Sequence, residues 1–244
     1  MKLGQNAMEK LRAEITGMLK EGDDLVITGD IALLGTALIV RYEKEFLKQF
    51  FSEGFLWDAQ RSPSLYGAYE TEALLKVPEE QTCEKLREEC TDWAEKSSVW
   101  EAARDMGADA LFALHTGGVL AGLWKMAEAS DSGLHIDLRR IPVRQETIEI
   151  CERFDLNPYK LLSAGSLLIG VRNGEELVQY CVQQEIPAAV IGRAVKGNDR
   201  LLYSGQNTRY LERPSEDELV KFSWGEQWKD KNRLPGRKEE KGKC

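Results

Sequence analysis

The sequence predicts an α/β protein of the α+β kind, in which a mixed β-sheet is packed with helices. Short apolar runs typical of buried strands alternate along the chain with amphipathic segments typical of helices. The two kinds of segment do not follow a regular strand–helix–strand repeat, which favours a mixed sheet over a doubly wound parallel one. With 244 residues, 42% of them apolar and 30% charged, the chain can bury one large core.

The first half of the chain begins with a predicted helix that ends near Gly22 and is followed by a buried strand at 24–29, DLVITG. Residues 31–51 are predicted to form one long amphipathic helix, and residues 56–69, with Pro, Ser and Gly, a loop. Residues 79–106 have a helical pattern with many charges, typical of a solvated outer face. The apolar stripe of the first helix consists of Met8, Leu11, Ile15, Met18 and Leu19.

The second half is predicted to alternate between strands and helices. An apolar strand from about residue 111 leads through a turn into a helix, and the last two strands are predicted to form a hairpin around KGN. The remaining ranges are a helix at 118–130, a strand at 133–138, a turn and helix at 141–156, a strand at 166–171, a helix at 174–185 and the hairpin strands at 188–195 and 199–205.

Charge and cysteine usage exclude several classes of protein. The net charge of −8 and the pI of about 5.1 argue against a general nucleic-acid surface and against an anionic-membrane anchor. Neither a signal peptide nor an apolar run long enough to span a membrane is present, so we expect a cytoplasmic protein. The five scattered cysteines include no CxxC pair, and they therefore predict neither a zinc site nor a disulfide framework.

Residues 111–124, LFALHTGGVLAGLW, suggest an anion-binding turn. An apolar strand runs into a glycine pair that opens a helix, so backbone N–H groups without helical partners point beyond the turn. The helix dipole and the missing Cβ atoms favour a phosphate or carboxylate there. The alternative is a tight turn whose glycines relieve steric strain, because the pair lacks the Walker and dinucleotide spacings. The candidate residues are His115, Thr116, Gly117 and Gly118.

Two further polar residues could add to such a site. Arg144 has the geometry to bind a phosphate, but it could equally be a surface arginine paired with Glu146 or Glu149. Asp137 ends a predicted strand and could contact the turn, although a polar strand end is the default. Because the histidines lack a ligand cluster in the sequence, no metal site and no catalytic residue is predicted.

Several motifs occur in the order in which a known family has them. The run from 117 to 171 resembles the C-terminal domain of the aminoimidazole ribonucleotide (AIR) synthetase superfamily, and most of all AIR-synthase-related and hydrogenase expression/formation proteins. The resemblance extends back to GDDLVITGDIALLGTALIV and forward to about residue 213. The motifs are the glycine pair before a helix, AEAS before a Gly-containing turn and a strand, IPVR before a helix, NPYKLL, and SAGSLLI.

The resemblance implies a domain division and a further part of the site. Residues 1–21 are expected to be an N-terminal helix, residues 22–213 the AIR-synthetase-like domain, and residues 214–244 a C-terminal helix with a charged mobile tail. In the family, the loop that corresponds to SAGS lies near the ligand cleft. This adds Ser163, Gly165 and Ser166 to the candidate ligand-binding residues.

Two departures from the family pattern bear on activity. Family members begin with a separate domain that supplies most ATP and metal contacts and the usual dimer barrel, and the chain is expected to lack it. The segment at His115–Gly118 is also shorter than in related proteins and has no acidic residue after the histidine. The hydrogenase-maturation enzyme of the family ends in a functional cysteine, but the tail KEEKGKC at Cys244 does not share its flanking residues.

Three functions remain open at the level of sequence. The first is a stand-alone domain, more a binding domain than an autonomous enzyme, that holds a phosphorylated or nucleotide-like ligand or a protein partner. The second is an ATP-dependent enzyme that works in trans, with ATP and magnesium as cofactors when a separate N-terminal-domain partner completes the site. The third is a structural dimerisation module, a homodimer formed through surfaces such as the apolar stripe of the first helix.

Overall fold

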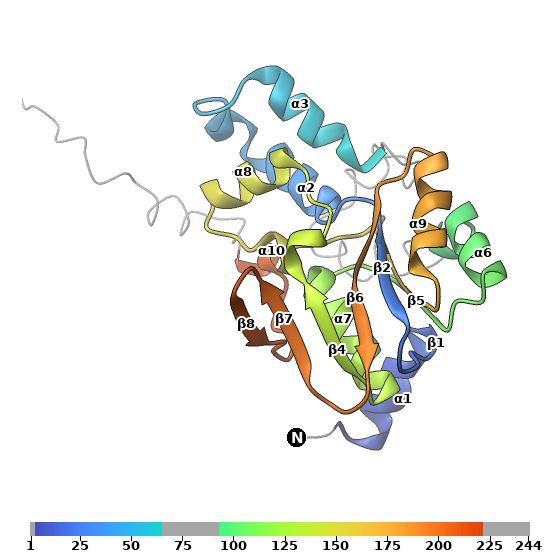
Figure 1. The fold of residues 1–244 in the computed structure, drawn as a ribbon. Helices are drawn as coiled ribbons and strands as arrows, with labels where there is room; N and C mark the ends of the chain where they lie inside the picture. The colour runs from blue at the N-terminus through green and yellow to red at the C-terminus, as the bar shows by residue number, and fades with distance from the viewer. Residues whose placement is uncertain (1–2, 65–92, 222–244) are drawn as a thin grey trace, which may run out of the picture.

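The structure is a computed structural model that describes residues 3–64 and 93–221 (Figure 1). Its helices are α1 (Gln5–Ala13), α2 (Leu33–Leu47), α3 (Glu53–Arg61), α6 (Ser98–Asp105), α7 (Gly118–Ser130), α8 (Gln145–Arg153), α9 (Gly174–Gln183) and α10 (Glu218–Lys221), with 3₁₀ helices η1 (Ser62–Ser64), η3 (Leu138–Arg140) and η4 (Pro158–Lys160). The strands are β1 (Thr16–Gly17), β2 (Asp24–Thr28), β3 (Ala110–Ala113), β4 (Gly133–Asp137), β5 (Leu167–Val171), β6 (Ala188–Val195), β7 (Arg200–Ser204) and β8 (Asn207–Tyr210).

The strands of the described residues form one mixed sheet, as the sequence predicts. Their order across the sheet is β1-β3-β5-β2-β6-β4-β7-β8. Neighbouring strands are antiparallel except β4 and β7, which run parallel. The central strands are short and almost wholly apolar, which is typical of strands covered on both faces.

Both faces of β2 are covered, and its side chains alternate between two separate cores. Leu25 and Ile27 pack into the larger core with the buried sides of α1, α2, α7 and α8, whereas Val26 packs into a second core with α6 and α9. In Figure 1, α6 and α9 lie together on one side of the sheet, and α2, α3 and α8 group at one end of the molecule. On β4, Gly133, Leu134 and Ile136 are buried, and His135 is exposed.

The first helix is shorter than predicted. It ends at Ala13, and the segment beyond it contains the edge strand β1, which pairs with β3. The apolar stripe continues past the helix because Ile15 and Leu19 fill the larger core from an extended segment, while Met18 is exposed. Gly17 has a φ of +80°, and a Cβ there would lie 2.1 Å from the carbonyl oxygen of Asp109, so the non-helical conformation at this position and its close approach to Asp109 require a glycine.

The predicted loop at 56–69 is also wrong in its first part. Residues up to Arg61 belong to α3, whose first turn is capped by the Ser52 hydroxyl accepting from the Phe55 N–H at 3.2 Å. A serine cap followed by apolar residues at helical spacing outweighs the turn residues that come later. The preceding helix α2 ends at Leu47 rather than at 51. Residues 65–92 lie outside the described residues, and they include the first half of the helix predicted at 79–106, which ends in α6.

The predicted hairpin of β6 and β7 does not form, because β4 lies between the two strands. β4 pairs antiparallel with β6 and parallel with β7. The connection between β6 and β7 crosses the start of β4, where the Leu134 N–H donates to the Asp199 carbonyl at 2.9 Å. A Cβ at Gly133 would lie 2.8 Å from that carbonyl oxygen, so the crossing depends on a glycine. Strand β8, which pairs with β7, has no counterpart among the predicted elements.

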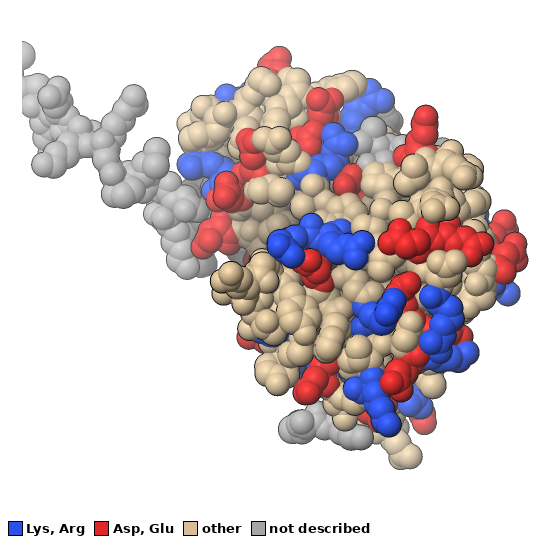
Figure 2. All heavy atoms as spheres, in the orientation of Figure 1, with Lys and Arg blue, Asp and Glu red and all other residues tan. Residues whose placement is uncertain are grey.

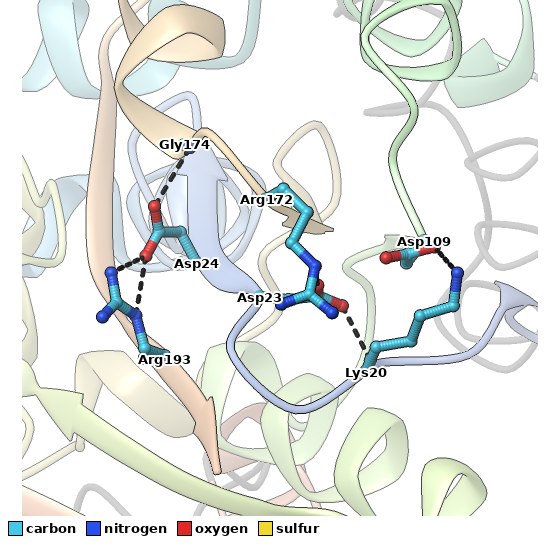
Figure 3. Close-up of polar contacts among 7 residues, drawn as sticks. All are labelled: Lys20, Asp23, Asp24, Asp109, Arg172, Gly174 and Arg193. Carbon is cyan, nitrogen blue, oxygen red and sulfur yellow. Dashed lines mark hydrogen bonds and ion pairs between the residues drawn. The ribbon is translucent and has the colours of Figure 1, made fainter.

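Buried charge ties the starting ends of β2 and β3 together, at the opposite end of these strands from the glycine turn. Asp23 is fully buried; its Oδ2 accepts from the Lys20 N–H at 2.7 Å, and its Oδ1 lies 3.3 Å from the Arg172 Nε. Burial raises the pKa of Asp23, and the neighbouring carboxyl of Asp109 raises it further. Figure 3 shows the cluster formed by Lys20, Asp23, Asp24, Asp109, Arg172, Gly174 and Arg193.

No helix among the described residues is long and apolar enough to cross a membrane. The tail predicted to be mobile lies outside those residues, except that α10 inserts Leu219 into the larger core. On the face drawn in Figure 2, Lys and Arg lie among Asp and Glu, with no broad area of either sign.

Candidate functional site

The glycine turn connects β3 to α7 as the sequence predicts. Gly117 is the N-cap of α7 with a φ of +82°, and Gly118 follows with a φ of +64°. Both values lie in the left-handed region that residues with a Cβ rarely adopt. The Gly118 N–H donates to the His115 carbonyl at 3.2 Å, so this donor is used within the turn.

A carboxyl group from the chain itself accepts the N–H of the other glycine of the turn. The Gly117 N–H donates to the Asp217 Oδ2 at 2.5 Å. The other oxygen of Asp217 accepts from the Leu219 N–H at 2.9 Å, and the Leu162 N–H is a further donor to this carboxyl group. Burial raises the pKa of Asp217, while these backbone donors lower it. The turn therefore already binds a carboxyl group, which belongs to a residue 100 positions away in the sequence.

Gly118 is required by packing. A Cβ at this position would lie 2.5 Å from the Tyr159 carbonyl oxygen and 2.8 Å from that of Leu161, both in or beside η4. The close approach of η4 to the start of α7 thus accounts for the second glycine of the pair. At Gly118 the structure therefore supports the interpretation that the glycines of the turn relieve steric strain.

His115 is buried, and Thr116 beside it is half-buried. His115 is 4% exposed, its Nδ1 lies 3.2 Å from the Thr116 Oγ1, and its ring meets the ring of Phe112 edge to face. The His115 Nε2 is 3.9 Å from the Glu14 carboxylate, which also binds Lys125 at 2.7 Å. These contacts tie the turn to the end of α1.

The SAGS loop lies beside the glycine turn and fastens the segment that follows β2. The Ser163 N–H donates to the His115 carbonyl at 3.2 Å, and the Ser163 hydroxyl accepts from the Ala32 N–H at 3.0 Å. The Ser166 hydroxyl donates to the Asp30 carbonyl at 2.9 Å. Both serines are buried, and Gly165 between them has a φ of +101°.

Asp137 and Arg144 have ion-pair partners nearby in the chain. Asp137 binds the Arg139 guanidinium at 2.9 Å and caps η3, and this pairing lowers the pKa of its carboxyl. Arg144 binds the Glu146 carboxylate at 2.8 Å and holds the pKa of Glu146 below its usual value. Of the nine predicted site residues, the turn and the SAGS loop are thus brought together, whereas Asp137 and Arg144 are held in separate pairs.

A cavity of about 190 Å³ opens beside the turn. Of the predicted residues, only Gly117 lines it. Three basic residues from two separate stretches also line it, namely Lys160, Arg209 and Arg213, and no ion pair joins them to a carboxylate within the described part of the chain. The rest of the lining is Leu120, Ala121, Leu202, Tyr210, Leu211, Glu212, Pro214, Ser215 and Glu216.

Sequence reasoning missed these basic residues and Asp217. Lys160 lies inside the motif NPYKLL, which predicts a turn, and the others lie close to or beyond the end of the family resemblance. The single available signal was the recurrence of Arg at positions 209 and 213 after the last predicted strand. That signal does not reveal which surface the two side chains face.

Metal-binding and reactive thiol groups are not found at this site. Within residues 3–64 and 93–221, no group of three or more His, Cys, Asp or Glu is placed to hold a metal ion. Cys151 and Cys181 are buried free thiols, and burial raises the pKa of Cys151 to about 12 and that of Cys181 to about 11. Cys244 lies outside the described residues.

Comparison with known proteins identifies the fold. HypE of E. coli, a hydrogenase maturation protein, has a crystal structure that matches with a TM-score of 0.54 at 22% identity over 82% of this chain and 52% of its own. A crystal structure of a HypE–HypF complex matches with a TM-score of 0.52 at 18% identity over 80% of this chain and 54% of its own. The carbamoyl dehydratase HypE of Rhodobacter capsulatus is 31% identical over 86 residues, which are 34% of this chain and 25% of that protein.

The chain therefore spans about half the length of the HypE structures that it matches. The family model described as "AIR synthase related protein, C-terminal domain" matches residues 20–203, which is well over half of the chain. This match includes the glycine turn, the SAGS loop, the strands β2 to β6 and all of β7 except its last residue, Ser204. The chain belongs to the family of AIR synthase related proteins and carries their C-terminal domain.

Proposed function

We propose that this chain is a ligand-binding domain whose cavity beside Gly117 takes the phosphate of a small phosphorylated or nucleotide-like molecule, without catalysing a reaction by itself. One observation carries the proposal: three basic residues without carboxylate partners among the described residues line a cavity that includes the N-terminus of α7, although the Arg213 guanidinium also lies 5.8 Å from the ring of Trp124. Arginine and lysine bind phosphate oxygens directly, and the helix terminus adds positive potential.

The acidic part of the lining favours a phosphate ester over a simple anion. Glu212 and Glu216 line the same cavity as Lys160, Arg209 and Arg213. A carboxylate repels a phosphate but accepts hydrogen bonds from hydroxyl groups. A molecule with a phosphate at one end and hydroxyl groups at the other, such as a ribose phosphate, suits this distribution of charge.

The test is a thermal-shift titration of the purified chain with inorganic phosphate, ribose 5-phosphate, AMP and ATP, each with and without magnesium. A ligand at about 100 times its Kd raises the melting temperature of a domain of this size by roughly 5 to 10 °C. Lys160→Ala should abolish the shift. The matched control is Lys196→Ala, which removes the same charge from an exposed position outside the cavity lining. Equal shifts in both variants would contradict the proposed site.

A second candidate function is an activity that requires another protein. A crystal structure of a HypE–HypF complex is among the similar structures, so a protein with this fold assembles with another chain. Measurement of phosphate release from ATP by the chain, alone and with a separate N-terminal-domain partner added, separates the two candidates, because release only in the presence of the partner supports the second. Magnesium-dependent hydrolysis by the isolated chain that Lys160→Ala removes would contradict the absence of independent catalysis.

A further inference from the structure

The segment that supplies Asp217 crosses the glycine turn as a strap, which we define as residues 214–220. It is fastened to the rest of the chain at two points: Leu219, which is 7% exposed and packs in the larger core, and Asp217, which accepts the N–H of Gly117. Figure 1 shows α10 on the same side of the molecule as β7 and β8. The residues between the end of β8 and Asp217 form part of the wall of the cavity.

The strap limits the cavity. Pro214, Ser215 and Glu216 belong to the lining, and the volume of about 190 Å³ is below the roughly 300 to 1,000 Å³ typical of small-molecule sites. The space as it stands suits a group of about the size of a phosphate. A nucleotide or sugar phosphate requires the wall formed by the strap to move.

The strap also occupies the hydrogen bond that a ligand would make. The Gly117 N–H, which points beyond the start of α7, is taken by the Asp217 Oδ2. A phosphate oxygen and a carboxylate oxygen have the same charge and accept the same donor, so they exclude each other at this position.

The closed position of the strap carries an electrostatic cost. Asp217 and Glu218 are 6% and 2% exposed, respectively, and they follow each other in the chain. Burial disfavours the charged form of Asp217, and the adjacent Glu218 disfavours it further. A strap that buries the Asp217 carboxyl group is held less firmly than its backbone contacts alone would suggest.

We propose that the strap is an autoinhibitory contact, in which the Asp217 carboxylate competes with the phosphate of the ligand for the Gly117 amide and the strap must leave before a larger ligand binds. This inference rests on the proposed function, since it concerns the same cavity. The apparent Kd then equals the intrinsic Kd divided by the fraction of molecules with the strap open. Changes that loosen the strap without touching the ligand therefore tighten binding.

The experiment compares the binding of inorganic phosphate and AMP to the full chain by isothermal titration calorimetry. Leu219→Ala removes a buried anchor of the strap that is not part of the cavity lining. Val220→Ala is the control, because it shortens an apolar side chain in the same segment that is 55% exposed. We expect Leu219→Ala and Asp217→Ala to bind both probes on the order of tenfold more tightly than the wild type, and Val220→Ala to bind them unchanged.

Hydrogen exchange of the wild-type chain gives a second measurement that needs no variant. Addition of AMP should increase amide exchange in residues 214–220, because the ligand displaces the strap. Decreased exchange there would mean that the strap closes over the ligand as a lid, which would overturn the inference.

The outcomes of the titrations separate this inference from the proposed function. If the wild type binds phosphate through Lys160 but neither loosening variant binds more tightly, the autoinhibitory contact is wrong and the binding function stands. If neither the wild type nor any loosened variant binds phosphate or AMP, the proposed function is wrong, and the strap has no ligand to exclude.

Discussion

Substitution of Gly118 by alanine tests whether the glycine turn is shaped by the close approach of η4. The structure separates two costs at this position: a φ of +64°, and a Cβ that would lie 2.5 Å from the Tyr159 carbonyl oxygen. Alanine in the left-handed region costs about 1 to 2 kcal/mol, and forcing an extra group into a packed contact costs about 1 to 3 kcal/mol. Gly118→Ala should therefore lower the free energy of unfolding by roughly 2 to 5 kcal/mol.

Two other glycines isolate these costs. Gly107 has a φ of +76°, and a Cβ at this position would have no atom within 4 Å, so Gly107→Ala should lower the free energy of unfolding only by the backbone cost of about 1 to 2 kcal/mol. Gly54 lies in α3 with an ordinary φ and open space, so Gly54→Ala should be neutral or stabilise by up to about 1 kcal/mol. Urea unfolding followed by far-UV circular dichroism gives the three free energies.

The difference between Gly118→Ala and Gly107→Ala reports the contact with η4 alone. A loss in Gly118→Ala no larger than that in Gly107→Ala would refute the reasoning, because the steric contact would then contribute nothing. The same result would favour the ligand-based explanation, in which position 118 is a glycine because a Cβ there would keep an anion away from the turn.

The remaining predictions concern buried polar groups. The pKa of Asp23 in the folded protein is raised above its ordinary value of 3.8, so protonated Asp23 contributes stability below pH 3.8, and this contribution is lost as the pH rises through the folded pKa. Asp23→Asn cannot ionise and should therefore gain stability relative to the wild type as the pH rises across this window. Urea midpoints measured at increasing pH test this prediction. Ser163→Ala leaves a buried amide without its acceptor and should cost about 1 to 3 kcal/mol, whereas Ser204→Ala, at an exposed strand end, should change the unfolding free energy by less than about 0.5 kcal/mol. Cys151 and Cys181 should resist iodoacetamide in the native protein and react in urea, as read by peptide mass spectrometry, and rapid native labelling of either would contradict their burial.

Periodicity alone was sufficient for most of the elements, because the apolar runs and helical stripes are local properties of the chain. The strands β2 and β5, and the helices α7, α8 and α9, lie close to their predicted ranges. The errors occur where a distant segment decides the conformation. The chain leaves the helix after Ala13, and Thr16 and Gly17 form an edge strand against β3. The strand β4 separates β6 from β7 because their connection crosses at Gly133.

The candidate site follows the same division. The sequence by itself determined the mixed α/β class, the strand–turn–helix at Gly117 and Gly118, and the order of motifs that marks the AIR synthase related family. Only the tertiary structure decided what meets that turn: η4 against Gly118, the Asp217 carboxylate on the Gly117 amide, and the basic side chains of Lys160 and Arg209 beside the cavity. The physical reason is that local backbone geometry decides which N–H groups a turn exposes, whereas the carboxyl group that accepts the Gly117 N–H comes from a segment 100 residues away in the sequence.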